Sequence, residues 1–174
     1  MIKLKDLLET DNILIPRRSK EEREKNYTLA IQRQLKSHIK NNVFMIPKGG
    51  PDDDAYGDSS YESGDEDFYL NLREEPITHL PDNITKIVGT LDLSETSLER
   101  LPSNLTRVER GGLFLSHTKI KQLPTNFTYV RYDLDLSNTP LESLPDNLIV
   151  NGNLYLTGTK ITELPKNLNV GGGL

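Results

Sequence analysis

One pattern occurs five times between residues 70 and 174 and dominates the chain. Each copy opens with Leu-x-Leu and ends with Leu-Pro, which is followed two residues after the proline by Asn. Successive copies start 21, 22, 21 and 20 residues apart, and one more leucine follows after another 20. The opening leucines are Leu70, Leu91, Leu113, Leu134, Leu154 and Leu174. A unit this short cannot bury its own apolar side chains, so the copies must stack on one another.

Within each copy, alternating apolar and polar residues predict a short strand with one buried side. In the second copy, Leu91 and Leu93 should face the core, while Asp92 and Ser94 face outward. The Leu-Pro pair disfavours a helix on the return path, because proline lacks a backbone donor and fixes φ. We therefore predict an α/β repeat solenoid of the leucine-rich repeat type. It should have short parallel strands on a concave face, extended convex limbs and an N-terminal helical cap.

Two polar columns recur in the copies, and we expect both to turn inward and satisfy backbone groups of the turns. A buried position that is the same in every copy cannot distinguish one ligand from another. The first column lies three residues after the second leucine, at Thr96, Thr118, Thr139 and Thr159. The second lies two residues after each proline, at Asn83, Asn104, Asn126, Asn147 and Asn167.

The sequence divides into a helical cap at residues 1–46, an acidic linker or loop at 47–68 and the solenoid at 69–174. In the cap, Ser19 and Glu22 have the spacing of a capping box at a helix start. The apolar stripe of this helix is formed by Tyr27, Ile31, Leu35 and Ile39, and Asn41-Asn42 should end it. We expect the helix to cover the open end of the first repeat.

The chain has a net charge of −5, which is concentrated in one stretch. Residues 48–68 hold one base and eight acids among Gly, Ser and Pro. An alternative function is an acidic decoy, in which residues 52–67 imitate nucleic-acid phosphates in a groove of a host protein. Its acids are Asp52, Asp53, Asp54, Asp58, Glu62, Asp65, Glu66 and Asp67. Calcium binding is disfavoured, because Ser63 stands where a calcium loop needs a bidentate Glu.

The outward side of the predicted strands holds the candidate binding residues. Its middle column varies between copies, unlike the two polar columns. Phe114 and Tyr155 on either side of Asp135 are typical of anchors for a protein partner, because aromatic residues are enriched at binding hot spots. The candidate surface comprises Tyr69, Asn71, Arg73, Asp92, Phe114, His117, Asp133, Asp135 and Tyr155.

Catalysis, cofactors and metals are not expected. Asp133 and Asp135 could form a carboxylate pair, but the pattern predicts no deep cleft around them. Ser116 and His117 are adjacent on a strand and should diverge, so they do not form a triad with Asp135. The chain has no Cys and three scattered His, which disfavours both disulfides and zinc.

The location and partners of the chain are constrained by its charge and hydropathy. No apolar run of 18 residues is present, and the charged start MIKLKDLLETDN does not fit a signal peptide. We therefore expect a cytoplasmic protein without membrane contact. The negative balance also disfavours direct DNA binding.

The most complete copy of the motif LP-x-NL-x-V-x-G-x-L-x-L-S-x-T runs from Val150 to Thr159. This motif resembles the short leucine-rich repeat proteins of tailed phages and, in repeat type, those of bacterial effectors. The opening LKDLLE…ILIPRRSKEEREKNY also resembles the start of the phage proteins. The resemblance implies an interaction module that binds or inhibits a host protein, such as a defence protein, in the host cytoplasm. The ubiquitin-ligase activity of some bacterial relatives needs a catalytic Cys, which this chain lacks.

The last copy stops one residue into a sixth unit, after Val170-Gly171-Gly172-Gly173. Leu164, Leu168 and Val170 should therefore lie close to an open end. An uncovered coil with an unpaired strand edge favours association, so an end-to-end homodimer or a docked partner is a third possibility.

Overall fold

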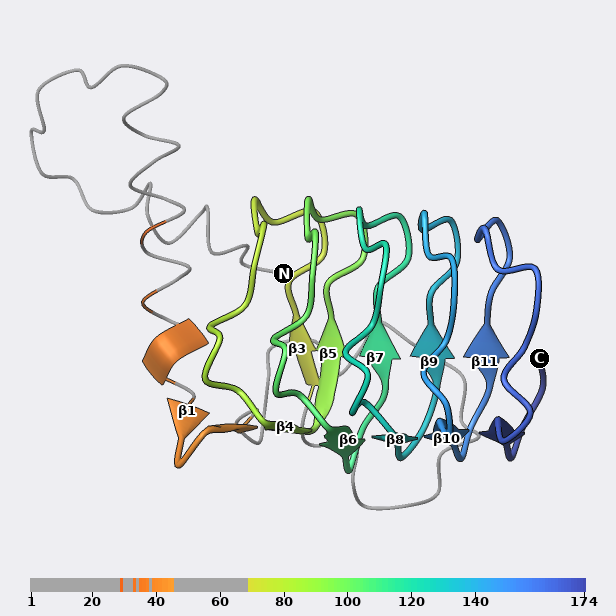
Figure 1. Cartoon of the computed structure of the whole chain (residues 1–174). Helices are drawn as coiled ribbons and strands as arrows, with labels where there is room; N and C mark the ends of the chain where they lie inside the picture. The colour runs from red at the N-terminus through yellow and green to blue at the C-terminus, as the bar shows by residue number, and fades with distance from the viewer. Residues whose placement is uncertain (1–28, 30–32, 34, 38, 46–68) are drawn as a thin grey trace, which may run out of the picture.

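The computed structural model describes residues 29, 33, 35–37, 39–45 and 69–174. From residue 69 onward the chain forms stacked coils that follow one another in sequence order (Figure 1). Each coil contains short parallel strands, and the described residues contain almost no helix. The predicted repeat solenoid is therefore confirmed, but the α/β class is wrong, because both regular sides of the coil are strands.

The first side is a parallel sheet of five strands, here called the five-strand sheet. It pairs the Leu-x-Leu segments of successive copies, as the repeat period predicted. Its strands are β3 (Tyr69–Asn71), β5 (Thr90–Asp92), β7 (Leu113–Phe114), β9 (Leu134–Asp135) and β11 (Leu154–Tyr155).

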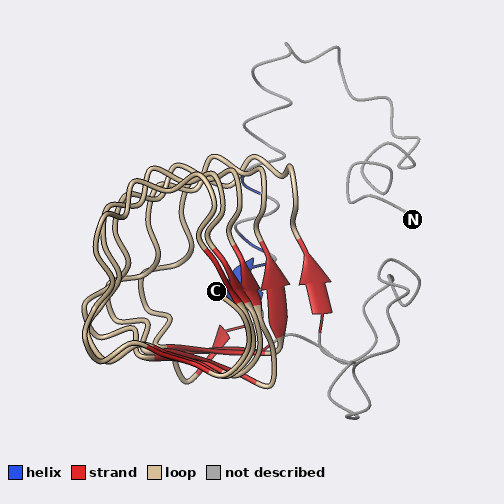
Figure 2. Cartoon of the chain, turned by 90° about the vertical axis from the view of Figure 1, so that its right-hand side faces the viewer, coloured by secondary structure: helices blue, strands red, loops and turns tan. Residues whose placement is uncertain are grey.

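The second side is a sheet of seven strands, here called the seven-strand sheet, which the sequence did not lead us to expect. Viewed along the stack, the two sheets form neighbouring sides of the coil, and turns and loops close the others (Figure 2). The coil strands of this sheet are β4 (Lys86–Val88), β6 (Arg107–Glu109), β8 (Tyr129–Val130), β10 (Ile149–Val150) and β12 (Asn169–Val170). All of them pair in parallel.

The corner between the two sheets requires a close approach of neighbouring coils. A Cβ atom on Gly111 would lie 2.1 Å from the carbonyl carbon of Gly89 in the preceding coil. Gly111 thus has a packing reason, because a side chain at this residue would clash with the backbone of the preceding coil. The 22-residue step arises at this corner, where Arg110 is an extra residue with φ of 56°.

The interior is a continuous apolar column. Leu91, Leu93 and their counterparts in the next two coils are fully buried, as are Ile77, Leu98, Ile120 and Leu141 on the opposite side. The Leu-Pro limbs contain no helix, as predicted. After each limb the chain turns, and four coils close this turn with a hydrogen bond from the third residue after proline to the proline carbonyl at 3.0–3.3 Å.

The two polar columns behave differently. Thr96, Thr118 and Thr139 are buried, and each hydroxyl donates to the carbonyl three residues earlier at 2.7–2.8 Å. Their predicted inward role is confirmed. The prediction for the Asn column is wrong, because all five Asn side chains are exposed. They occupy the third position of the turn after Leu-Pro, from which a side chain points outward.

The predicted helical cap is wrong at its C-terminal end. Helix is described at residues 29, 33 and 35–37, but Ile39 lies in β1 (Ile39–Lys40), which pairs antiparallel with β2 (Val43–Met45). Asn41 and Asn42, with φ of 52° and 63°, form the tight hairpin turn between them. Strand β2 pairs with β4 and buries Phe44 completely, so a hairpin extends the seven-strand sheet.

The rest of the predicted cap and the acidic segment 47–68 lie outside the described residues. Within the part of the chain that is described, no helix has the length and apolar character needed to cross a bilayer.

Candidate protein-binding surface

The outward side of the five-strand sheet carries the predicted middle column as one continuous row. Strand pairing aligns each member with the next along the stack. The row consists of Asn71, Asp92, Phe114, Asp135 and Tyr155. With neighbouring strands about 4.8 Å apart, it spans about 20 Å of surface.

Three members of this row hold the local backbone in place. The side-chain oxygen of Asn71 accepts from the amide N–H of Arg73 at 2.9 Å. Asp92 and Asp135 accept in the same way from the amide two residues later, each at 2.8 Å. A side-chain oxygen at this position therefore caps the turn that follows the strand.

Asp92 and Asp133 are less available to a partner than the sequence suggested. Asp92 is 4% exposed, and its second oxygen accepts from the hydroxyl of Tyr69 at 3.3 Å. Asp133 is 8% exposed and accepts from the amide N–H of Asn153 in the next coil at 2.7 Å. Because a buried carboxylate without partners is unstable, these contacts give both groups a structural role.

Phe114 and Tyr155 differ from the other members of the row. A phenylalanine has no oxygen with which to cap the turn, and the hydroxyl of a tyrosine is too far from its own backbone. Phe114 is half-buried and Tyr155 is 44% exposed. Two of the five coils thus carry an aromatic ring in place of the turn-capping oxygen.

The edge of this surface is a row of residues with left-handed backbone. Glu74, Glu95, His117, Asn138 and Gly158 have φ between 56° and 74°. Arg73 and Glu95 form an ion pair along this edge, and both side chains are substantially exposed. Nε2 of His117 lies 3.2 Å from Nδ2 of Asn138.

His117 and Asp135, two of the residues considered for a triad, each have another partner. His117 pairs with Asn138, and Asp135 accepts from the backbone of Ser137. Among the described residues, no hydrogen bond joins Ser116, His117 and Asp135 to one another, and no group of three potential metal ligands is placed to hold an ion.

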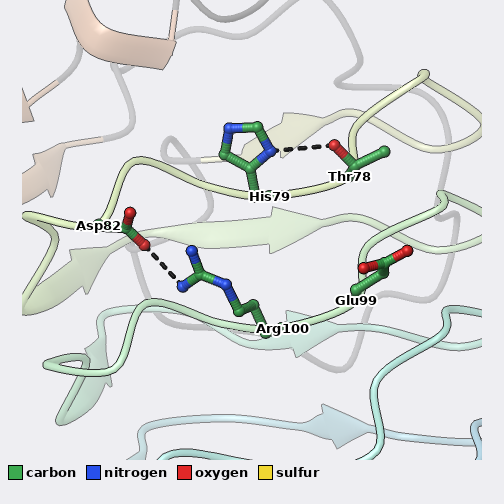
Figure 3. Close-up of a pocket in the computed structure, with 5 residues that line it drawn as sticks. All are labelled: Thr78, His79, Asp82, Glu99 and Arg100. Atoms are coloured by element: carbon green, nitrogen blue, oxygen red, sulfur yellow. Dashed lines mark hydrogen bonds and ion pairs between the residues drawn. The ribbon is translucent and has the colours of Figure 1, made fainter.

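A shallow pocket lies on the limbs of the first two coils (Figure 3). Its floor holds an exposed ion pair in which Nη1 of Arg100 is 2.7 Å from Oδ1 of Asp82. The hydrogen bond and charge of Arg100 lower the pKa of Asp82 below its ordinary value. The remaining lining residues are Thr78, His79 and Glu99. Exposed ion pairs contribute little to stability.

No family model matches the chain, and comparison with curated proteins and with solved structures gives no match either. The resemblance to phage repeat proteins therefore stays a prediction. The acids of residues 52–67 lie outside the described part of the chain, so the decoy interpretation also stays a prediction.

Proposed function

We propose that the chain is a non-catalytic interaction module that binds a partner protein through the outward side of the five-strand sheet. The proposal is carried by Phe114 and Tyr155, which replace the oxygen that caps the turn in the other coils. An aromatic ring at such a position exposes apolar surface and gives up a hydrogen bond, which makes sense where a partner covers it.

The size of the surface suits a protein partner better than a small molecule. The row is about 20 Å long and flat, without the concave, enclosing shape of a small-molecule site. Exposed polar groups lie on the edge of this surface beside Phe114, at Glu95, His117 and Asn138. A central aromatic anchor with a polar rim is the usual arrangement of a protein interface.

The resemblance to phage repeat proteins supports a host protein as the partner, met in the host cytoplasm. A defence protein is one such target. This part of the proposal depends on the sequence motif and not on the geometry.

The test replaces each aromatic with the residue that other coils carry, as Phe114→Asp and Tyr155→Asp. The new carboxylate supplies the turn cap, so the melting temperature of the double variant should equal that of the wild type. Loss of two anchors should weaken binding by a factor of about 100 or more, since a hot-spot residue contributes about 2 kcal/mol or more.

The wild-type chain, the double variant and a Lys121→Ala control on the exposed limb are used to capture proteins from a host lysate. A captured protein is then titrated against all three. If the folded double variant binds the captured protein as tightly as the wild type does, this assignment of the surface is refuted.

A second candidate is self-association through the last coil. Leu164 is 45% exposed, whereas its counterparts in the earlier coils are 1–7% exposed. Leu174 is 70% exposed, and its counterpart Leu154 is fully buried. Sedimentation velocity tests this: a dimer that Leu164→Glu dissociates supports it, and a monomer at high concentration refutes it.

A further inference from the structure

The outward side of the seven-strand sheet is a second surface, and its charge is opposite to that of the outward side of the five-strand sheet. Its inward residues Ile87, Val108, Val130 and Val150 are fully or nearly fully buried, so their neighbours in the strands point outward. One outward column runs through Lys40, Val43, Lys86, Arg107, Tyr129, Ile149 and Asn169. The parallel column runs through Met45, Val88, Glu109, Arg131, Asn151 and Gly171.

These two columns carry four cations and one carboxylate. Glu109 lies between two of the cations, 3.2 Å from Nζ of Lys86 and 3.7 Å from Nη1 of Arg107. The surface therefore remains positive although the chain as a whole is negative. The outward side of the five-strand sheet has the reverse balance, with Asp92, Asp133 and Asp135 against Arg73.

The centre of this surface is a fixed aromatic and guanidinium cluster. Nδ2 of Asn151 donates to the hydroxyl of Tyr129 at 3.2 Å. The guanidinium carbon of Arg131 lies 5.8 Å from the ring centre of Tyr132, which is cation–π distance. Because neighbouring side chains hold the arginine, less conformational entropy is lost when it binds a ligand.

Apolar side chains lie in the same two columns. Met45 is 42% exposed and Ile149 is 38% exposed, although large apolar residues of the described coils are otherwise mostly buried. Tyrosine, arginine and methionine are enriched at protein interfaces, and all three are present here.

We propose that this surface binds an acidic segment of a partner protein in which carboxylates alternate with apolar side chains. Arg107 and Arg131 present planar donor groups that match a carboxylate with two hydrogen bonds each. Met45, Tyr129 and Ile149 receive the apolar side chains of that segment. The protein then has two docking surfaces of opposite charge, and the second one does not depend on the function proposed for the first.

Nucleic acid fits this surface less well than a peptide. Lys86 and Arg107 already share Glu109 between them, which lowers the positive charge that a phosphate backbone would meet along its length. Phosphate-driven binding also needs many cations, and about six to ten contacts are typical. Four cations on a flat sheet supply too few, whereas a peptide gains additional binding energy from apolar contacts.

The experiment measures fluorescence anisotropy of a labelled peptide of glutamates interrupted by leucines. Wild-type chain is compared with Arg107→Glu/Arg131→Glu and with Lys119→Glu/Lys121→Glu, which makes the same charge change on the exposed limb. The first variant should weaken binding about 30-fold or more, and the limb variant less than about 3-fold. If the first variant unfolds, Arg107→Gln/Arg131→Gln replaces it.

Three further binding measurements distinguish which ligand the surface binds. An oligo-dT strand of the same net charge should bind more weakly than the peptide, and tighter binding would assign the surface to nucleic acid. Deletion of residues 52–67 should leave peptide affinity unchanged. A rise of about tenfold would instead show that the chain's own acidic segment occupies the surface. Phe114→Asp/Tyr155→Asp should bind the peptide as wild type does, and no peptide binding by the wild type would overturn the proposal.

Discussion

Replacement of Gly111 by alanine should lower the free energy of unfolding by about 3–5 kcal/mol. The new Cβ atom would lie 2.1 Å from the carbonyl carbon of Gly89 and 2.2 Å from the amide nitrogen of Thr90. Both contacts are with backbone, which cannot rotate away, so the neighbouring coils must separate. That separation strains two inter-coil hydrogen bonds, from Gly89 to the carbonyl of Glu109 at 2.8 Å and from Tyr132 to that of Gly111 at 3.2 Å. Each is worth about 1 kcal/mol, and overpacking adds about 1–3 kcal/mol.

Urea unfolding followed by far-ultraviolet circular dichroism measures this change. With a slope of about 2 kcal/mol per molar urea, the midpoint should fall by about 2 M. Gly173→Ala is the matched control, because its Cβ would meet nothing closer than a side-chain oxygen of Asn153 at 3.4 Å. Equal midpoints for the two variants would refute the close-packed corner.

Three further predictions concern single positions. Thr118→Val should destabilise the solenoid by about 1–2 kcal/mol in the same urea assay, because it removes the buried hydrogen bond to the carbonyl of Leu115. His117→Gly should raise the free energy of unfolding by about 1 kcal/mol, because φ is 57° at this exposed position. The carboxyl of Asp82 should titrate below its ordinary pKa in an NMR titration and return to it in Arg100→Ala. A lowered folded-state pKa means that this pair stabilises the fold above the ordinary pKa of Asp, and the contribution is lost as pH falls through the lowered value.

The stacking of the coils could be predicted because it depends on features that every copy repeats. Leucines at fixed positions identify the buried side of each strand, and Leu-Pro excludes a helix on the limb. The second sheet was missed for a physical reason. Its coil strands each point a single apolar residue into the core, such as Val108 or Val130, so they lack the apolar–polar–apolar alternation that identifies the Leu-x-Leu strands.

The N-terminal error has a related cause. Ile39 continues a helical apolar spacing, and local periodicity alone favours a helix there. The segment instead forms a hairpin that pairs with the edge of β4, because this pairing buries Phe44 and satisfies backbone groups of the first coil. Tertiary contact therefore outweighs the local pattern. Asn41-Asn42 do not end the helix as predicted, because they form the turn between β1 and β2.

The alignment of the row in the five-strand sheet could be predicted, but the hydrogen bonds of its members could not. Strand alternation correctly placed Asn71, Asp92 and Asp135 in one outward row. Their hydrogen bonds to the backbone two residues later could not be inferred, because they depend on the turn geometry after the strand. Some outward-facing residues of a repeat thus stabilise the coil through hydrogen bonds to its backbone, and others do not.

Positions that depart from the repeat are a better guide to function than the repeated positions, because the repeated residues already stabilise the coil. Phe114 gives up the turn cap, Arg110 is an added residue with left-handed backbone, and Tyr132 stands in the column where the other corners carry glycine. All three belong to neighbouring coils in the middle of the stack. Two of them place partly buried aromatic rings at its surface. If the proposed function is correct, these two coils are the first place to look for a bound partner.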